Sequence, residues 1–315
     1  MALNILILLG GLLVLILGGD FLIKGASSFA LKMKLSPLVV GLTIVAFGTS
    51  APELLISIKA AMDGSPDLAM GNVIGSNICN LALVLGLTAL ISPILVRRNS
   101  IWIDWPMTMG SSLLLYLLVR EGFINSYEGL LFIGILVLYL FFVIRRSRHD
   151  IKVSKELEQD FNLPESSSSY LRDFTYIILG SAGLYLGAEL FVGSAQDFAR
   201  YLGIEERIIG ITVVALGTSL PELVTACVAS FKKETDLALG NLMGSNLFNI
   251  LSILGITSII KEIKVNDIII NTDIIWMLGI TLIILPMMLS KRQIGRVEGV
   301  ILLLIYIYYM YMVVW

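Results

Sequence analysis

The fold is decided by a stretch of sequence that occurs twice. Residues 41–91 read GLTIVAFGTSAPELLISIKAAMDGSPDLAMGNVIGSNICNLALVLGLTALI, and residues 210–260 read GITVVALGTSLPELVTACVASFKKETDLALGNLMGSNLFNILSILGITSII. Aligned without a gap, the two stretches are identical at 24 of 51 positions. The same offset of 169 residues pairs 17–30 with 186–199. Similarity at one fixed offset over this length indicates an internal duplication.

The composition of the chain is typical of a membrane protein. Of its 315 residues, 57% are hydrophobic and only 15% are charged, against about 25% charged in an average soluble domain. About 20 apolar residues span a bilayer, so about 30 residues per span and loop predict roughly ten spans. This composition excludes a soluble enzyme, a secreted disulfide-built module and a disordered chain. The net charge of -2 argues against a nucleic-acid partner.

Apolar runs and helix breakers predict ten transmembrane helices. They are expected near residues 2–23, 37–61, 67–91, 101–119, 124–144, 174–198, 206–231, 236–260, 268–289 and 294–315. Because each half then holds five helices, an odd number, the second half is expected to lie upside down relative to the first. Such inverted repeats are found in many secondary transporters, which bind their substrate at the midplane on interrupted helices. We therefore predict an all-α polytopic membrane fold in which helices 2, 3, 7 and 8 are broken.

The longest polar stretch, residues 145–173, divides the chain nearly in half. We expect it to link a first repeat at 1–144 to a second at 174–315. With the N-terminus outside, 16 Lys and Arg residues fall in inside loops and five in outside loops. Because Lys and Arg concentrate in cytoplasmic loops, we predict a multi-pass plasma-membrane protein with a cytoplasmic linker and both termini extracellular. The first helix follows no basic leader and is expected to be a retained span.

Two polar motifs are the best-matched part of the repeat. GTSAPE at 48–53 faces GTSLPE at 217–222, and GNVIGSN-x-x-N at 71–80 faces GNLMGSN-x-x-N at 240–249. Hydrocarbon packing requires none of these polar side chains. Their repetition therefore indicates a polar site inside the membrane.

The first motif places several oxygen atoms together. Pro52 has no N–H, so the carbonyl of Gly48 loses its helical partner, and freed carbonyls at membrane depth are tolerated only in a protein-lined cavity. Ser50 and Glu53 are three residues apart and share a helix face. A hydroxyl, freed carbonyls and one carboxylate are therefore expected to face one place. The second half repeats the arrangement with Ala215, Thr218, Ser219, Pro221 and Glu222.

The second motif adds hydroxyl and amide oxygens, because Ser76 and Asn80 are four residues apart, as are Ser245 and Asn249. The combined set contains no His or Cys, and hard cations such as Ca2+, Na+ and Mg2+ prefer oxygen ligands of this kind. Two carboxylates balance one divalent ion, and without it they would take up protons or Na+, because buried charge is costly. Competition at one site is the minimal requirement of an antiporter.

These doubled motifs resemble the alpha-repeats of the Ca2+/cation antiporter superfamily, and within it the prokaryotic sodium/calcium exchangers, over nearly the whole chain. The resemblance implies Na+/Ca2+ antiport by alternating access, electrogenic with several Na+ per Ca2+, by a functional monomer in the lipid bilayer. It implies no cofactor and no enzymatic activity. It also implies four adjacent cation sites between helices 2, 3, 7 and 8, with Glu53 and Glu222 shared between ions and with Asn80 and Asn249 lining the middle. The residues it implies as cation ligands are Ala46, Thr49, Ser50, Glu53, Ser76, Asn80, Ala215, Thr218, Ser219, Glu222, Ser245 and Asn249.

The sequence departs from some branches of this family. Asn249 stands where some members carry Asp, which argues against K+ co-transport and leaves occupancy of the middle site open. Ile74 and Met243 stand where the proton/calcium branch usually places its acid, which favours Na+ over H+. A H+/Ca2+ or other divalent-cation antiporter on the same scaffold remains the alternative. An intramembrane enzyme is disfavoured because the spans contain no His, and a channel would not need doubled carboxylate sites.

Other polar residues of the predicted spans have simpler interpretations. Asp20 and Glu189 are repeat equivalents that either border an ion pathway or make structural bonds near helix ends, and the second reading is favoured. Lys59 has no counterpart in the other half, and its amine is expected to reach the interface. Four further asparagines are expected to satisfy the backbone of broken helices: Asn72, Asn77, Asn241 and Asn246.

Overall fold

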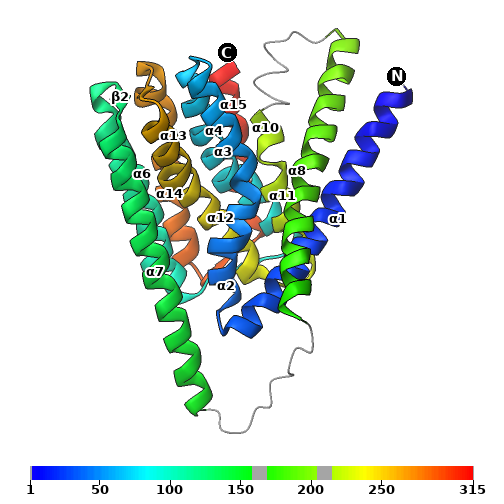
Figure 1. The fold of residues 1–315 in the computed structure, drawn as a ribbon, viewed down its shortest axis with the longest axis vertical. Coiled ribbons are helices and arrows are strands. Elements are labelled where there is room, and N and C mark those ends of the chain that lie inside the picture. Colours follow the sequence, from blue (N-terminus) through cyan, green and yellow to red (C-terminus); the bar gives the residue numbers. More distant parts are fainter. Residues whose placement is uncertain (1, 158–168, 204–214, 315) are drawn as a thin grey trace.

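The computed structural model describes residues 2–157, 169–203 and 215–314. In this part of the chain most residues lie in helices that pack side by side as a bundle (Figure 1). Both chain ends lie at one end of the bundle, whereas α7 (Ser126–Leu157) ends and α8 (Tyr170–Tyr201) begins at the opposite end (Figure 1). An even number of membrane crossings requires such an arrangement.

The elements before α8 form a continuous series. They are α1 (Ala2–Met33), α2 (Pro37–Val40), η1 (Gly41–Val45), α3 (Ala46–Met62), α4 (Pro66–Ile78), η2 (Cys79–Val84), α5 (Leu85–Ile91), β1 (Ile94–Leu95), η3 (Ser100–Asp104), α6 (Trp105–Leu118), η4 (Val119–Glu121), β2 (Phe123–Ile124) and α7. The segments η1 and η2 are wider π-helical turns that join the α-helices on either side without interrupting the helical path, and η3 is a π-helical turn that leads directly into α6.

The elements after α8 follow the same order where the structure describes them. They are α10 (Ala215–Thr218), α11 (Leu220–Phe231), α12 (Thr235–Leu247), η6 (Phe248–Leu254), α13 (Gly255–Ile260), β3 (Ile263–Lys264), η7 (Ile269–Asp273), α14 (Ile274–Leu289), β4 (Gln293–Ile294) and α15 (Arg296–Val314). Two short antiparallel pairs, β1 with β4 and β2 with β3, each join a strand of the first half to one of the second.

The protein is an all-helical polytopic membrane protein. Within the described ranges, eight helical stretches are long and apolar enough to cross a membrane. This number is two fewer than the ten transmembrane helices predicted from the sequence. The predicted fourth span holds the 14-residue α6, and the predicted seventh holds the 12-residue α11, while its residues 206–214 lie outside the described part.

Several helices are longer than predicted. The helix α1 reaches Met33 instead of residue 23, and α7 continues to Leu157 through the first part of the predicted linker 145–173. Hydropathy locates the hydrocarbon, whereas Lys, Arg and Glu are good helix formers that extend a helix into water. The predicted break at Pro52 is also absent, because α3 runs through it as one helix. A proline removes only one helical hydrogen bond and can bend a helix without ending it.

The helices α1 and α8 pack along each other through glycines at one flank of the bundle (Figure 1). A Cβ added to Gly18 would lie 2.7 Å from the backbone nitrogen of Leu184, and one on Gly187 would lie 2.7 Å from that of Leu15. Glycine is therefore required for this close backbone approach.

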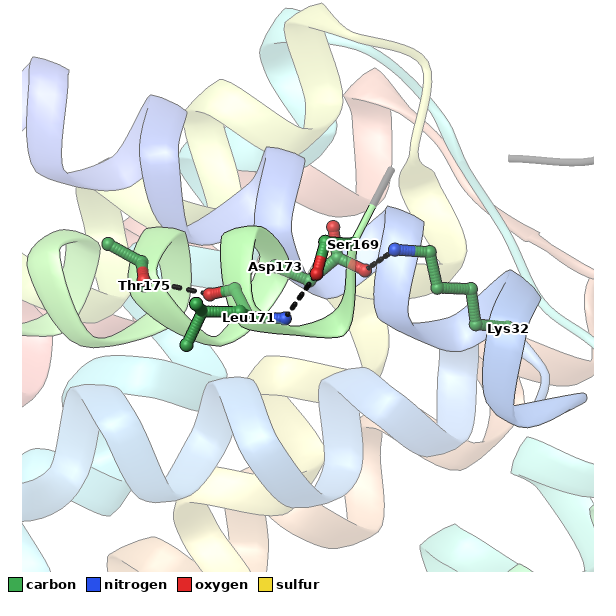
Figure 2. Close-up of polar contacts among 5 residues, drawn as sticks. All are labelled: Lys32, Ser169, Leu171, Asp173 and Thr175. Atoms are coloured by element: carbon green, nitrogen blue, oxygen red, sulfur yellow. Dashed lines mark hydrogen bonds and ion pairs between the residues drawn. The ribbon is translucent and has the colours of Figure 1, made fainter. Parts of the chain in front are cut away.

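Polar contacts fix the far end of this helix pair (Figure 2). The Lys32 ammonium of α1 forms an ion pair with Asp173 in the first turn of α8. Ser169 caps α8 by accepting a hydrogen bond from the Leu171 backbone nitrogen at 3.2 Å, and the Thr175 hydroxyl donates to the Leu171 carbonyl at 2.7 Å. The ion pair is nearly withdrawn from solvent, with 9% and 1% of the two side chains exposed.

The centre of the bundle is occupied by α12, whose residues from Leu237 onward are all buried. It contacts η1 and α3 through glycines. A Cβ on Gly41 would lie 2.6 Å from the Leu237 carbonyl oxygen, and one on Gly244 would lie 2.6 Å from the Leu42 carbonyl oxygen. This close packing brings the polar motifs of the two halves into contact.

Candidate functional site

Two carboxylates lie inside the bundle. Glu53 is in the interior of α3 and Glu222 is in the first turn of α11, and both side chains are fully buried. Neither forms an ion pair with a basic residue of the described ranges, and Lys59, which lies on the same helix as Glu53, is exposed. A pair of buried carboxylates without a basic partner is costly unless a cation or proton neutralises it.

The four oxygens of this pair differ in their surroundings. Both oxygens of Glu53 and Oε2 of Glu222 are buried without a hydrogen-bond partner in the part of the chain that the structure describes. Oε1 of Glu222 accepts hydrogen bonds from the hydroxyls of Ser50 at 3.2 Å and Ser245 at 3.3 Å. The first half of the chain therefore supplies a donor to the carboxylate of the second half, as a site between two repeats requires.

A second set of contacts joins Thr49 to α12. Its hydroxyl lies 3.2 Å from the Ala46 carbonyl oxygen and 3.2 Å from Oδ1 of Asn241, so it can donate to either. It is also 3.3 Å from the Ser245 hydroxyl. On the other side of the site, the hydroxyls of Ser76 and Thr218 are 3.4 Å apart.

The asparagines of the second motif fall into two groups. Asn80 is fully buried, and within the described ranges neither its amide oxygen nor its nitrogen has a hydrogen-bond partner; the amide oxygen of Asn249 has none there either. The nitrogen of Asn249 donates to Oδ1 of Asn77 at 3.0 Å. Asn77 and Asn246 donate to backbone carbonyls at 3.4 Å and 3.0 Å, as expected for residues that satisfy the helical backbone.

Asn72 and Asn241 extend this pattern. Asn72 donates to the Ser57 hydroxyl at 3.0 Å and to the Glu53 carbonyl oxygen at 3.3 Å, so it supports the helix that carries the first carboxylate. Asn241 accepts from Thr49 and was predicted only as a backbone partner. Its position in the GN dipeptide that both halves of the chain repeat is the one sequence signal for this role.

Most of the predicted ligands are buried. Thr218 is half-buried, and Ala215 begins α10. The others are buried: Ala46, Thr49, Ser50, Glu53, Ser76, Asn80, Ser219, Glu222, Ser245 and Asn249. The contacts above bring together Thr49, Ser50, Glu222 and Ser245 in one cluster and Ser76 with Thr218 in another.

The two halves present their carboxylates differently. In the second half the helix is interrupted at Ser219, and Pro221 and Glu222 begin the new helix α11. Proline suits this first turn because its missing N–H would have no helical acceptor there, and a carboxylate in the first turn is stabilised by the helix dipole. Glu53, by contrast, lies inside the continuous α3. The predicted interruption is therefore present at one of the two proline motifs.

The donor set is suited to a hard cation. Within the described residues, no group of three or more His, Cys, Asp or Glu side chains could hold a metal ion. A cation at this site would therefore rely on two carboxylates together with hydroxyl, amide and backbone oxygens. Oxygens of these kinds are the ligands of Ca2+ and other hard cations.

Comparison with known proteins identifies the family. The family model described as "Sodium/calcium exchanger protein" matches residues 3–145 and 173–315. The chain belongs to the sodium/calcium exchanger family. The two matched segments have the same order of motifs and together leave out only residues 1–2 and 146–172, which include the last part of α7 and the first residues of α8.

Individual relatives of this exchanger cover almost its whole length. It is 40% identical to the "Putative antiporter CaxA" of Alkalimonas amylolytica, over 96% of each chain. It is 32% identical to the "Sodium/calcium exchanger MaX1" of Methanosarcina acetivorans, again over 96% of each chain. Among solved structures, the sodium-calcium exchanger NCX_Mj, soaked with zero Na+ and Ca2+, matches with a TM-score of 0.83 and 31% identity, over 98% of this chain and 97% of that one.

Proposed function

We propose that the protein exchanges Na+ for Ca2+ across the membrane at a site built on Glu53 and Glu222. The observation that carries the proposal is the pair of fully buried carboxylates, which have no basic partner among the described residues and three of whose four oxygens make no hydrogen bond there. Membership of the exchanger family supports it, as do the named activities of relatives such as MaX1 and NCX_Mj.

The charge of the site explains why the two ions would compete. Two carboxylates carry two negative charges, which one Ca2+ or two Na+ would balance. A state that leaves the pair without cations buries two like charges and is strongly disfavoured. The protein would then change the side to which its site is open only when the site holds cations. This requirement couples the movement of one ion to the counter-movement of the other.

Neutral oxygens complete the proposed sites. The predicted ligands are the twelve residues Ala46, Thr49, Ser50, Glu53, Ser76, Asn80, Ala215, Thr218, Ser219, Glu222, Ser245 and Asn249. The bonds from Ser50 and Ser245 to Glu222 support them directly, because these bonds place hydroxyl oxygens against a carboxylate that has a second oxygen free. No resident cofactor is proposed, since Ca2+ and Na+ are the transported substrates.

The proposed architecture has ten spans in two inverted five-helix repeats, residues 1–144 and 174–315, joined by a cytoplasmic linker at 145–173. The 24 identities of the internal repeat support it, as does the location of both chain ends at one end of the bundle (Figure 1). The excess of Lys and Arg in the loops at the opposite end supports extracellular termini in the plasma membrane. A monomer in the lipid bilayer contains the complete proposed site.

The proposed cycle is electrogenic. A tenfold Na+ gradient provides about 1.4 kcal/mol per ion, and one net charge moving through 100 mV provides about 2.3 kcal/mol. Two Na+ per Ca2+ would sustain a Ca2+ gradient of about 10², whereas three Na+ add both contributions and reach about 10⁴ to 10⁵. We propose the second stoichiometry.

The test is 45Ca2+ uptake into proteoliposomes, driven by an outward Na+ gradient with pH clamped on both sides. We expect robust uptake by the wild-type protein and none by Glu53→Gln or Glu222→Gln. Asp104→Asn is the matched control, because Asp104 is also a buried carboxyl group, bonded to the Tyr139 hydroxyl at 2.9 Å, and it lies outside the proposed site. Wild-type uptake by either glutamate variant would overturn the site assignment, and uptake driven by a pH gradient alone would establish the H+/Ca2+ alternative.

A further inference from the structure

A chain of side-chain hydrogen bonds joins the two halves of the protein next to the proposed site. Nδ2 of Asn249 in η6 donates to Oδ1 of Asn77 in α4 at 3.0 Å. Nδ2 of Asn77 in turn donates to the carbonyl oxygen of Asn246 in α12 at 3.4 Å and to the sulfur of Met277 in α14 at 3.6 Å. All four residues are buried, so water does not compete for these bonds.

The partners of Asn77 fix the direction of this chain of bonds. The donor nitrogen and the acceptor oxygen of an asparagine amide have nearly the same outline, so the partners decide which way the amide is turned. A backbone carbonyl and a thioether can only accept a hydrogen bond. Asn77 must therefore turn its nitrogen toward Asn246 and Met277 and its oxygen toward Asn249. The reversed amide would lose all three bonds at a buried position, where unpaired polar groups are costly.

The amide of Asn249 is oriented as a consequence. Because its nitrogen is bonded to Asn77, its oxygen points to the other side of the amide, and that oxygen is buried without a hydrogen-bond partner in the described part of the chain. Asn249 follows Ser245 by four residues, and the Ser245 hydroxyl donates to the Glu222 carboxylate at 3.3 Å. Amide oxygens are ligands of hard cations, so this oxygen remains available to a cation held beside Glu222.

The other half of the protein lacks the equivalent bond. At the offset of 169 residues, Asn77 and Asn249 correspond to Asn246 and Asn80. The nitrogen of Asn246 donates instead to the Leu242 carbonyl oxygen of its own helix at 3.0 Å. Among the described residues, the oxygen of Asn246 and both amide atoms of Asn80 have no hydrogen-bond partner. The amide of Asn80 is therefore not held in one orientation, although its position in the repeat is the same as that of Asn249.

We propose that Asn77 is a positioning residue of the exchange site, which holds the Asn249 amide with its oxygen available to the transported cation. Asn80 takes up its own orientation only when a cation binds. The proposal rests on the proposed function, in which Asn80 and Asn249 line the site. Without Asn77, the N–H groups of Asn249 can turn toward the carboxylates of the cation-free protein, and that bond must break before a cation binds. Holding a ligand group in its bound orientation avoids this cost.

The first test detects the bond between Asn77 and Asn249 without any cation. Melting temperatures are measured in detergent, with choline in place of Na+ and with Ca2+ chelated. Asn77→Ala and Asn249→Ala each remove the shared bond, so the double variant should lose less than the sum of the two single losses. Asn246→Ala and Asn80→Ala are the matched control, because these equivalent positions share no bond, and their losses should add. Additive losses for the first pair would overturn the proposal.

A second substitution separates the bond from the cavity that alanine leaves. Asn77→Leu keeps the branched shape of asparagine but has no hydrogen-bonding group. Combined with Asn249→Ala, it should show the same deviation from additivity as Asn77→Ala. If Asn77→Ala does not fold, the measurement with Asn77→Leu decides, and additive losses there would equally overturn the proposal.

The second test measures the positioning role by equilibrium binding of 45Ca2+ to the purified variants. Asn77→Ala should raise the apparent Kd for Ca2+ about tenfold or more, because a hydrogen bond to a charged group must then be broken. Asn249→Ala should raise it at least as much, and the double variant should match Asn249→Ala. Asn246→Ala, whose side chain bonds only within its own helix, should stay within about twofold of the wild type.

A merely structural role of Asn77 would lower the melting temperature without this dependence on Asn249. An apparent Kd that Asn77→Ala leaves unchanged, or raises equally with and without Asn249, would overturn the proposal. The predicted binding pattern in a protein whose wild type shows no Na+-driven Ca2+ uptake would instead contradict the exchange function alone.

Discussion

The contact of Gly244 in α12 with η1 and the start of α3 is a tightly packed point next to the site. A Cβ at Gly244 would lie 2.6 Å from the Leu42 carbonyl oxygen and 2.7 Å from the Ala46 Cβ, where ordinary contact begins at 3.4 Å. Gly244→Ala would therefore force the two helices apart by 3.4 minus 2.6, or about 0.8 Å. Overpacking of this kind costs about 1–3 kcal/mol of folding stability.

This displacement of α12 would also move Ser245, the residue after Gly244. The Ser245 hydroxyl is 3.3 Å from Oε1 of Glu222 and 3.3 Å from the Thr49 hydroxyl, already near the upper limit of a hydrogen bond. A shift of about 0.8 Å would break both contacts. In enzymes, a misplacement of about 1 Å costs about 10²-fold in rate, and we expect a loss of similar size in Na+-driven Ca2+ uptake.

The assay combines thermal unfolding in detergent with uptake into proteoliposomes at matched protein content. Gly279→Ala in α14 is the control, because a Cβ there meets nothing within 4 Å and alanine favours a helix by up to about 1 kcal/mol over glycine. We expect Gly244→Ala to lower both the melting temperature and the uptake, and Gly279→Ala to lower neither. Wild-type uptake by Gly244→Ala would refute the account of helix packing at the site.

Three further substitutions probe separate contacts. Ser50→Ala removes a hydrogen bond to a buried carboxylate and should lower the stability of the cation-free protein by about 1.5–3 kcal/mol. Ser219→Ala is the control and should leave the melting temperature unchanged, because the Ser219 hydroxyl makes no such bond. Lys32→Met removes the ion pair with the buried Asp173 and should cost about 3–5 kcal/mol, most of which a second change, Asp173→Leu, should restore; equal melting temperatures for the single and double variants would contradict this. Burial, and then a neighbouring aspartate, raise the pKa of Glu234 in the loop before α12. A raised pKa favours the folded state at pH values below the ordinary pKa of glutamate, and this stabilisation is lost as pH rises through the pKa of the folded protein. Glu234→Gln should therefore be more stable than the wild type at neutral pH but not in acid. A difference in melting temperature between the two proteins that is constant with pH would contradict this.

The centre of the site could be predicted from the sequence because its chemistry is unusual for a membrane. Glu53 and Glu222 are carboxylates at equivalent positions of a repeat, each directly after a proline, and the structure buries both completely. Asn80, predicted to line the middle of the site, has an amide that is buried without a hydrogen-bond partner among the described residues. A polar group in hydrocarbon has few explanations, so its position in the sequence is already informative.

The differences between the halves could not be predicted in the same way. Aligned repeats predict equivalence, yet the chain is interrupted at Ser219 while α3 continues through Pro52. Likewise, Asp20 is paired with two lysines, whereas Glu189 faces a cavity. Such differences depend on which residues of other helices lie nearby, and pairwise contacts between distant segments are not visible in one sequence.

Helix ends were predicted poorly for a related reason. Hydropathy falls where a helix leaves the hydrocarbon, but α7 continues through Arg145 and Arg146 because the backbone bonds continue in water. The residue pairs that end or anchor helices, such as Lys32 with Asp173, join segments far apart in the chain. Their charges were visible in the sequence, but their pairing was not.

The central claim is that Na+ and Ca2+ share the carboxylates Glu53 and Glu222. Equilibrium binding of 45Ca2+ to the purified protein, titrated with Na+ at constant ionic strength and pH, tests it most directly. The account predicts that Na+ raises the apparent Kd for Ca2+ without lowering the number of ions bound at saturation, and that Glu53→Gln and Glu222→Gln each abolish binding. An apparent Kd that does not change with Na+, or saturable Ca2+ binding that survives both substitutions, would contradict the shared site.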